Sequence, residues 1–154
     1  MARRAGVYKK GALGLYDIIQ TAKANKDFHK AGGIALFIGF VRNETKDKRK
    51  VKKLELEAYE EKANEVLERI CNDLNRRDGI IDVQIHHLLG EFNVGEELVY
   101  VLVAGAHRRE LFPILQEAVE LYKKEAPIFK KEYIINKEGK TESFWVSEQE
   151  RKDD

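Results

Sequence analysis

Positively charged side chains gather in one stretch of the sequence, residues 106–132, which carries two arginines, four lysines and a histidine. Grouped cations of this kind bind phosphates and carboxylates. A lysine among them can also act as an acid, a base or a nucleophile. The same stretch has an apolar pattern with helical spacing, formed by Leu111, Ile114, Leu115, Ala118, Leu121 and Tyr122. We therefore expect a helix that ends before Pro127.

The two lysines at the end of this helix differ in position. At about 100° per residue, Lys123 lies at the edge of the apolar stripe, whereas Lys124 points to solvent. Desolvation at the edge of a buried face can activate a lysine, so Lys123 is the candidate for catalysis. The alternative is that both lysines only complement the helix dipole, as lysines at a helix C-terminus commonly do.

A strand with a period of two is expected over residues 128–135. It places Lys130 and Glu132 on the same side, so that Lys123 and Lys130 could reach one spot. Functional sites are usually built where elements begin or end, and three further cations lie at such places: Arg42, His107 and Arg108.

Other chemistries have less support in the sequence. His86 and His87 are adjacent on an expected strand and face opposite ways. No set of His and Cys residues has the spacing of metal ligands, so we expect neither a metal nor a cofactor. Glycine-rich phosphate loops and a serine nucleophile elbow are absent from the sequence. The one cysteine, Cys71, borders an apolar helical stripe, which favours a core residue over a reactive thiol.

The composition limits the class of partner. A net charge of +1 at pH 7 argues against general attraction to nucleic acid or to a membrane surface. No apolar run is long enough to cross a bilayer, we expect no secretory leader, and a single cysteine suits the reducing cytoplasm. We expect a single domain over residues 1–154, with residues 1–14 and 147–154 flexible or docked on a partner.

The expected elements alternate between helices and paired strands. Residues 1–14 form a loop or a weak edge strand, Asp17 caps the first helix, and residues 60–77 form a second, amphipathic helix. Strands are expected over residues 34–41, 51–59, 80–89, 97–105, 128–135 and 143–146. Tight turns between neighbouring strands imply a largely antiparallel sheet. The fold class is therefore α+β, with three main helices on one face of the sheet.

Five segments, taken together and in order, resemble a known family. They are FIGFVRNET (37–45), LEAYEEKA (56–63), HHLLGEFNVGEELV (86–99), AGAHRRELF (104–112) and YKKEAPIFKKE (122–132). Over residues 33–146 the chain resembles the large, catalytic subunit of molybdopterin synthase.

That resemblance implies an α/β-hammerhead-like fold and a homodimer within a heterotetramer. The partner would be a small ubiquitin-like sulfur-carrier subunit with a C-terminal Gly-Gly thiocarboxylate. The substrate would be cyclic pyranopterin monophosphate (precursor Z), which receives two sulfur atoms to form the dithiolene of molybdopterin, without a metal at this step.

The resemblance also implies roles for particular residues. Lys123 would be the catalytic lysine, acting either as an acid and base or covalently, and Lys130 would be a second catalytic lysine that contacts the carrier tail or the substrate. The substrate-binding residues would be Arg42, His107 and Arg108 for the phosphate or pterin, Phe37 in the pocket wall and Glu132 beside Lys130.

The chain departs from the family pattern at two places that bear on the site. Gln149 stands where the family has an arginine, and Arg151 is a candidate replacement. Leu88 stands where an arginine often follows the histidine, which weakens the case for His87. The alternative function is a non-catalytic dimeric module that binds a ubiquitin-like partner or a phosphorylated small molecule. The presence of both Lys123 and Lys130 favours the enzyme, because a binding module needs only one of the two charges.

Overall fold

One sheet of seven strands organises the protein, and the computed structural model describes residues 3–146 of it. The strands follow the order β2-β5-β4-β3-β6-β7, and β1 pairs with β4. Their bounds are β1 Ala5–Lys9, β2 Gly33–Phe40, β3 Lys50–Ala58, β4 Ile80–Asn93, β5 Glu97–Gly105, β6 Ile128–Ile135 and β7 Thr141–Trp145. The pairing of β1 with β4 is parallel and the other pairings are antiparallel. The expected α+β fold with a largely antiparallel sheet is confirmed.

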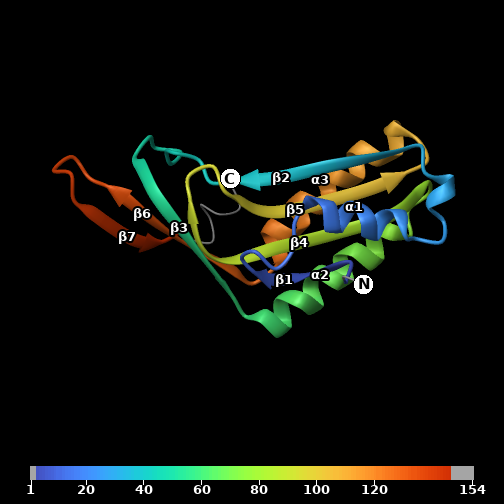
Figure 1. The fold of residues 1–154 in the computed structure, drawn as a ribbon, viewed down its shortest axis with the longest axis horizontal. Coiled ribbons are helices and arrows are strands. Elements are labelled where there is room, and N and C mark those ends of the chain that lie inside the picture. Colours follow the sequence, from blue (N-terminus) through green and yellow to red (C-terminus); the bar gives the residue numbers. More distant parts are fainter. Residues whose placement is uncertain (1–2, 147–154) are drawn as a thin grey trace.

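The long strand β4 belongs to two parts of this sheet. Its first residues pair with β1 and β5, whereas residues 90–93 pair with β3. Gly90 lies where one part gives way to the other, and its φ of 128° is a conformation that glycine adopts readily and other residues rarely do. Figure 1 shows the result, an arm made of β3, β6 and β7 that projects away from the helices.

The main helices are α1 (Leu15–Lys23), α2 (Glu60–Asn75) and α3 (Arg108–Glu125), and they do not share one face of the sheet. Successive residues of β4 point to opposite faces. Gln84 donates from its side chain to the carbonyl of Ile18 in α1, at 3.0 Å. His87 instead packs its ring against Tyr122 of α3, with 5.7 Å between ring centroids. The expectation of helices on one face is therefore wrong, because periodicity identifies a helix's buried side but not the sheet face that it covers.

Most residues of the apolar stripes expected from the sequence are buried, whereas Leu115 and Leu121 of the third helix are half-buried. In α3 the buried residues are Leu111, Ile114, Ala118 and Tyr122. In α2 they are Ala63, Val66, Leu67, Ile70, Cys71 and Leu74. Burial raises the pKa of the Cys71 thiol, so this cysteine is the unreactive core residue that its position predicts.

The N-terminal segment contains the strand β1, one of the two alternatives expected for residues 1–14. Ala5 and Val7 are buried, and the backbone N–H of Val7 donates to the side-chain oxygen of Asn64 in α2 at 2.7 Å. The cap of α1 differs from expectation, since the N-cap residue is Gly14. Asp17 is the third helical residue, and its carboxylate accepts from the backbone N–H of Gly14 at 2.8 Å.

Candidate active site

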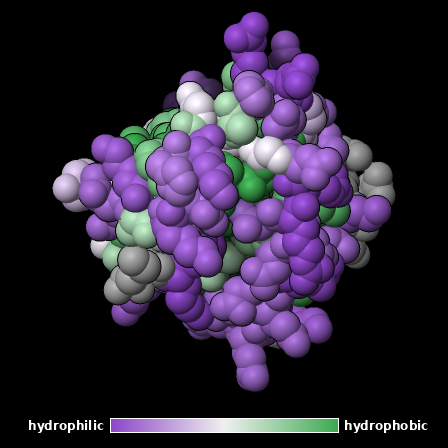
Figure 2. All heavy atoms as spheres, turned by 90° about the vertical axis from the view of Figure 1, so that its right-hand side faces the viewer, coloured by the Kyte–Doolittle hydropathy of each residue, from purple (hydrophilic) through white to green (hydrophobic). Residues whose placement is uncertain are grey.

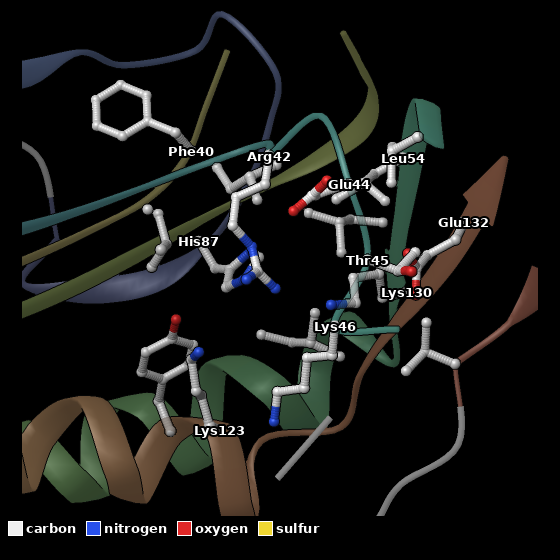
Figure 3. A pocket seen from close by; sticks show the side chains of 18 of the residues that line it. Phe40, Arg42, Glu44, Thr45, Lys46, Leu54, His87, Lys123, Lys130 and Glu132 are labelled. Carbon is white, nitrogen blue, oxygen red and sulfur yellow. The ribbon is translucent and has the colours of Figure 1, made fainter. Parts of the chain in front are cut away.

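A cavity of about 660 Å³ opens between the C-terminal end of α3, the arm and the β2–β3 loop (residues 41–49). We refer to it as the pocket. Figure 3 shows side chains entering it from all three of these regions. The lining combines apolar residues of β2 and β3 with charged residues, of which the cations are Arg42, Lys46, Arg49, Lys123 and Lys130 and the carboxylates are Glu44, Asp47 and Glu132. Such a mixture suits an anionic ligand with an apolar or aromatic body.

Lys123 reaches the pocket from the last turn of α3. Its neighbour Tyr122 is buried, Lys123 itself is half-buried, and Lys124 is exposed and does not line the pocket. The helix ends at Ala126, whose φ of −76° and ψ of 131° are extended. The difference in position between the two lysines that helical periodicity predicts is therefore present in the structure.

Lys130 and Glu132 reach the same pocket from β6, only a few residues beyond the helix. In the register of the arm, Lys130 pairs with Leu56 and Glu132 with Leu54, and both leucines also line the pocket. Lys131 points to the other side of the sheet, where its ammonium lies 5.3 Å from the centroid of the Tyr133 ring. The alternation of β6 thus gives one lysine to the pocket and the next to the outer surface of the arm.

Arg42 and Phe37 come from β2 and from the loop that follows it. Val41 is buried, and its carbonyl accepts from the backbone N–H of Gly95 at 2.9 Å, which holds the chain at the point where β2 ends. Arg42 follows directly and turns its guanidinium toward the pocket (Figure 3). Phe37 is half-buried in the wall of the same cavity.

His107 and Arg108 do not reach this pocket within one chain. His107 is the N-cap of α3, its side chain is 67% exposed, and its Nδ1 lies 3.4 Å from the carboxylate of Glu110. Arg108 begins the helix and Lys123 lies in its last turn, so the two are separated by about 22 Å along the axis at a rise of 1.5 Å per residue. Figure 1 shows α3 running from one side of the molecule toward its middle, where the arm begins. Figure 2 views the end that holds His107 and Arg108, and hydrophilic side chains cover most of it.

Two residues that line the pocket, His87 and Lys46, are not predicted as site residues from the sequence patterns. The presence of Leu88 weakens the case for His87, yet His87 lines the pocket. Its Nδ1 lies 2.9 Å from the carbonyl oxygen of Leu88, and since a carbonyl only accepts, Nδ1 carries the proton. Every second residue of β4 faces α3, and this alternation is the signal that could have identified His87. Lys46 is missed because it lies in a polar loop with no periodic pattern.

The described residues contain no group of three or more His, Cys, Asp or Glu side chains that could hold a metal ion. Within the same residues, no helix is long and apolar enough to cross a membrane. Gln149 and Arg151, the two candidates for a C-terminal contribution to the site, lie outside the described residues.

Comparison with known proteins gives consistent matches. A family model described as "MoaE protein" matches residues 15–125. The chain is 41% identical over 128 residues to the molybdopterin synthase catalytic subunit of Pyrococcus abyssi, covering 83% of this chain and 82% of that protein. It is 37% identical over 133 residues to a "Probable molybdopterin synthase" of Haloferax volcanii, covering 86% of this chain and 49% of that relative. The chain thus spans about half the length of the latter.

Solved structures agree with these relatives. Molybdopterin synthase from Staphylococcus aureus superposes with a TM-score of 0.81 at 25% identity, covering 96% of this chain and 99% of that one. A complex of subunits 1 and 2 of molybdopterin-converting factor from Helicobacter pylori contains the same fold, with a TM-score of 0.68 at 20% identity and coverage of 90% and 88%. By its family match and its relatives, this chain belongs to the MoaE family, the family of molybdopterin synthase catalytic subunits.

Proposed function

We propose that this protein is the catalytic subunit of a molybdopterin synthase. It would transfer sulfur from the thiocarboxylate of a small carrier protein to cyclic pyranopterin monophosphate, leaving a carboxylate on the carrier at each of two transfers. The observation that carries the proposal is the convergence of Arg42, Lys123 and Lys130, from three separate segments, on one cavity of about 660 Å³. The phosphorylated substrate and the carrier tail are both anionic, so each needs cations at close range.

The roles of the pocket residues follow from their positions. Lys123 is half-buried at the helix end and is the residue we assign to proton transfer or covalent participation. Lys130 assists it, with Glu132 on the same face of β6 to orient the ammonium. Arg42 provides a planar guanidinium for the phosphate. Phe37 supplies apolar surface for the pterin.

His107 and Arg108 fit the same site only if a second copy of the chain supplies them. Within one chain they lie at the far end of α3 from Lys123, and a rigid helix keeps them there. Both are exposed and available to a neighbouring molecule. A homodimer that places this helix end over the partner's pocket would add these two side chains to the cations that already line it. This arrangement would require two copies of the chain for each functional pocket.

The carrier is the other expected partner. The Helicobacter pylori structure is a complex of two different subunits, and the subunit with this fold is one of them. In the protein described here, the pocket would receive the end of the carrier as an extended, anionic peptide. One small carrier for each catalytic chain gives the heterotetramer that the family resemblance implies.

The direct test is reconstitution. The protein is mixed with thiocarboxylated carrier and cyclic pyranopterin monophosphate, and dithiolene product is measured in a single turnover. A carrier with an ordinary carboxylate is the control. Product that depends on the thiocarboxylate supports the proposal. Carrier binding without product would favour the alternative, a non-catalytic module.

The shared site has its own test. Lys123→Ala and Arg108→Ala proteins are prepared separately, mixed and allowed to exchange subunits. In a mixed dimer, one pocket keeps Lys123 and receives an intact Arg108 from the other chain. Activity should therefore reappear on mixing if the site spans two chains. If mixing restores nothing although mixed dimers form, Arg108 does not act across the interface.

A further inference from the structure

We propose that Lys46 of the β2–β3 loop is an additional substrate-binding residue, which contacts the phosphate of the small-molecule substrate. The inference rests on the proposed function and deepens it. Lys46 lines the pocket together with Arg42 and Lys123. Figure 3 shows these three side chains extending into the same space from a loop, a strand end and a helix end. A phosphate bound there would be contacted from several directions, as its oxygens require.

The backbone that carries Lys46 is a closed turn. The backbone N–H of Thr45 donates to the carbonyl of Arg49 at 2.9 Å, and the N–H of Lys48 donates to the carbonyl of Thr45 at 3.0 Å. The N–H of Arg49 also donates to the hydroxyl of Thr45 at 3.0 Å. Thr45 itself is buried, although the residues around it are exposed. Because this backbone is already ordered, ligand binding has little loop entropy to overcome.

A second set of contacts attaches the turn to the arm. The guanidinium of Arg49 lies 4.6 Å from the centroid of the Phe144 ring in β7. Arg49 also pairs with the carboxylate of Asp47 at 2.9 Å. The hydrogen bonds of Asp47 to Thr45 and Arg49 lower the pKa of its carboxyl, so Asp47 stays ionised and its charge is offset by Arg49. Asp47 and Arg49 therefore offset each other, while Lys46 and Glu44 contribute one charge of each sign to the lining of the pocket.

The same turn provides a matched control. Lys48 is two residues further on, is exposed, and does not line the pocket. Its φ of 65° is in the left-handed region, and Gln is no more strained there than Lys. Lys46→Gln and Lys48→Gln therefore remove one charge each from the same loop, and only the first removes it from the pocket.

The first experiment follows binding without turnover. Inorganic phosphate is titrated into the wild-type protein, Lys46→Gln, Lys46→Arg and Lys48→Gln, and backbone amide shifts are recorded by NMR. Lys46→Gln should weaken phosphate binding about tenfold, the order expected for one charge-assisted hydrogen bond. Lys46→Arg should recover most of the affinity, and Lys48→Gln should stay within about twofold of wild type. Equal affinities for the two Gln variants would overturn the proposal, as would phosphate that perturbs no pocket amide in the wild type.

The second experiment uses the reaction. Lys46→Gln should raise KM for the phosphorylated pterin about tenfold with kcat nearly unchanged, because a contact made equally in the ground and transition states changes only KM. The affinity for the carrier should not change. A fall in kcat alone, or weaker carrier binding alone, would contradict the assignment to the substrate phosphate. If no protein, including wild type, forms product, the proposed function fails, whereas the phosphate titration still decides the role of Lys46.

Discussion

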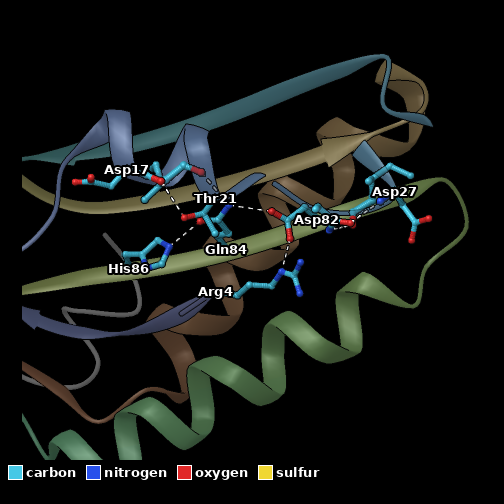
Figure 4. Close-up of polar contacts among 10 residues, drawn as sticks. Arg4, Asp17, Thr21, Asp27, Asp82, Gln84 and His86 are labelled. Carbon is cyan, nitrogen blue, oxygen red and sulfur yellow. Dashed lines mark hydrogen bonds and ion pairs between the residues drawn. The ribbon is translucent and has the colours of Figure 1, made fainter. Parts of the chain in front are cut away.

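His86 and His87 are adjacent in β4 but belong to two different polar regions. His86 is part of a buried hydrogen-bonded network, and His87 lines the pocket. His86 is fully buried on the face toward α1, and its Nε2 lies 2.8 Å from Oε1 of Gln84. Gln84 uses its amide nitrogen to donate to Asp82 at 2.9 Å and to the backbone of α1, so its oxygen must accept from His86. Asp82 in turn pairs with Arg4 at 2.6 Å. Figure 4 shows this closed network, which consists of Arg4, Asp82, Gln84 and His86.

The pocket on the other side of β4 is built differently. It gathers cations from separate segments around a cavity, and His87 lies among them. In the closed network, a buried charge meets an opposite charge within the protein, so its interaction energy contributes to folding. In the pocket, cations outnumber carboxylates around an open cavity, so the charge there favours the binding of an anion. Variants of the network should therefore change stability and spare turnover, whereas variants of the pocket should do the reverse.

The largest effect is expected from Lys123→Ala. Loss of an acid or base that acts in the transition state typically costs about 10²–10⁴-fold in rate. Product formation in the reconstituted reaction should fall by that factor, while the midpoint of urea unfolding stays close to wild type. Lys124→Ala, one residue away and exposed, should retain near wild-type turnover. Normal turnover by Lys123→Ala would remove Lys123 from the chemistry.

The next effect is expected in the closed network, from Arg4→Met. The Asp82 side chain is 0% exposed, so loss of its partner leaves a buried carboxylate without its counter-ion. Breaking a fully buried pair costs roughly 3–5 kcal/mol in the free energy of unfolding, and the loss here should be smaller because the Arg4 side chain is 48% exposed. Denaturant titration would measure it. Arg76→Met is the control, because it breaks an exposed pair with Asp73 that should contribute well under about 1 kcal/mol. Equal losses in the two variants would mean that the network does not stabilise the fold.

A pH-dependent effect should follow from His86. Burial, assisted by the positive charge of Arg3, lowers the pKa of His86 to about 4 from 6.5. Its Nδ1 has no hydrogen-bond partner among the described residues, so a proton added there would be poorly stabilised. Since the unfolded chain binds this proton at higher pH than the folded chain, stability is fully present above about pH 6.5 and is lost as the pH falls toward 4.

The loss across this pH window should amount to about 3 kcal/mol. Unfolding free energies of wild type and His86→Gln at several pH values would test it. The variant should be less stable at pH 7 but have a flatter acid limb. His29→Gln, which removes an exposed imidazole, is the control and should keep the wild-type slope. An unchanged slope in His86→Gln would assign the acid sensitivity to other groups.

The two regions also differ in how well the sequence predicts them. Periodicity is sufficient to place Lys123 at the edge of a buried helix face and Lys130 on one side of a strand, because both are local properties. The closed network depends on Arg4 and Asp82, which are 78 positions apart and meet only through the parallel pairing of β1 with β4. Sequence patterns do not encode such a partner choice.

The expected grouping of His107 and Arg108 with Lys123 shows a different limit. These residues are grouped because they are charged and lie at the ends of elements. Neither criterion takes account of the length of the helix that separates them. At 1.5 Å per residue, α3 already separates Arg108 from Lys123 within one chain. The same arithmetic could have predicted from the sequence that a second copy must supply these residues if they belong to the site.

The smallest effect expected is the increase in stability when phosphate binds. Measuring it in variants of both regions tests the pocket and the buried network together. Phosphate that binds the folded pocket and not the unfolded chain should raise stability by RT ln(1 + [L]/Kd), about 1 kcal/mol at a concentration several times Kd. Arg42→Gln should lose most of this increment in Tm while keeping the Tm of wild type without phosphate. Arg4→Met should start from a lower Tm and gain the full increment, because the pocket is intact. If Arg4→Met also loses the increment, the two faces of β4 are energetically coupled, and the division between a stabilising region and a binding region does not hold.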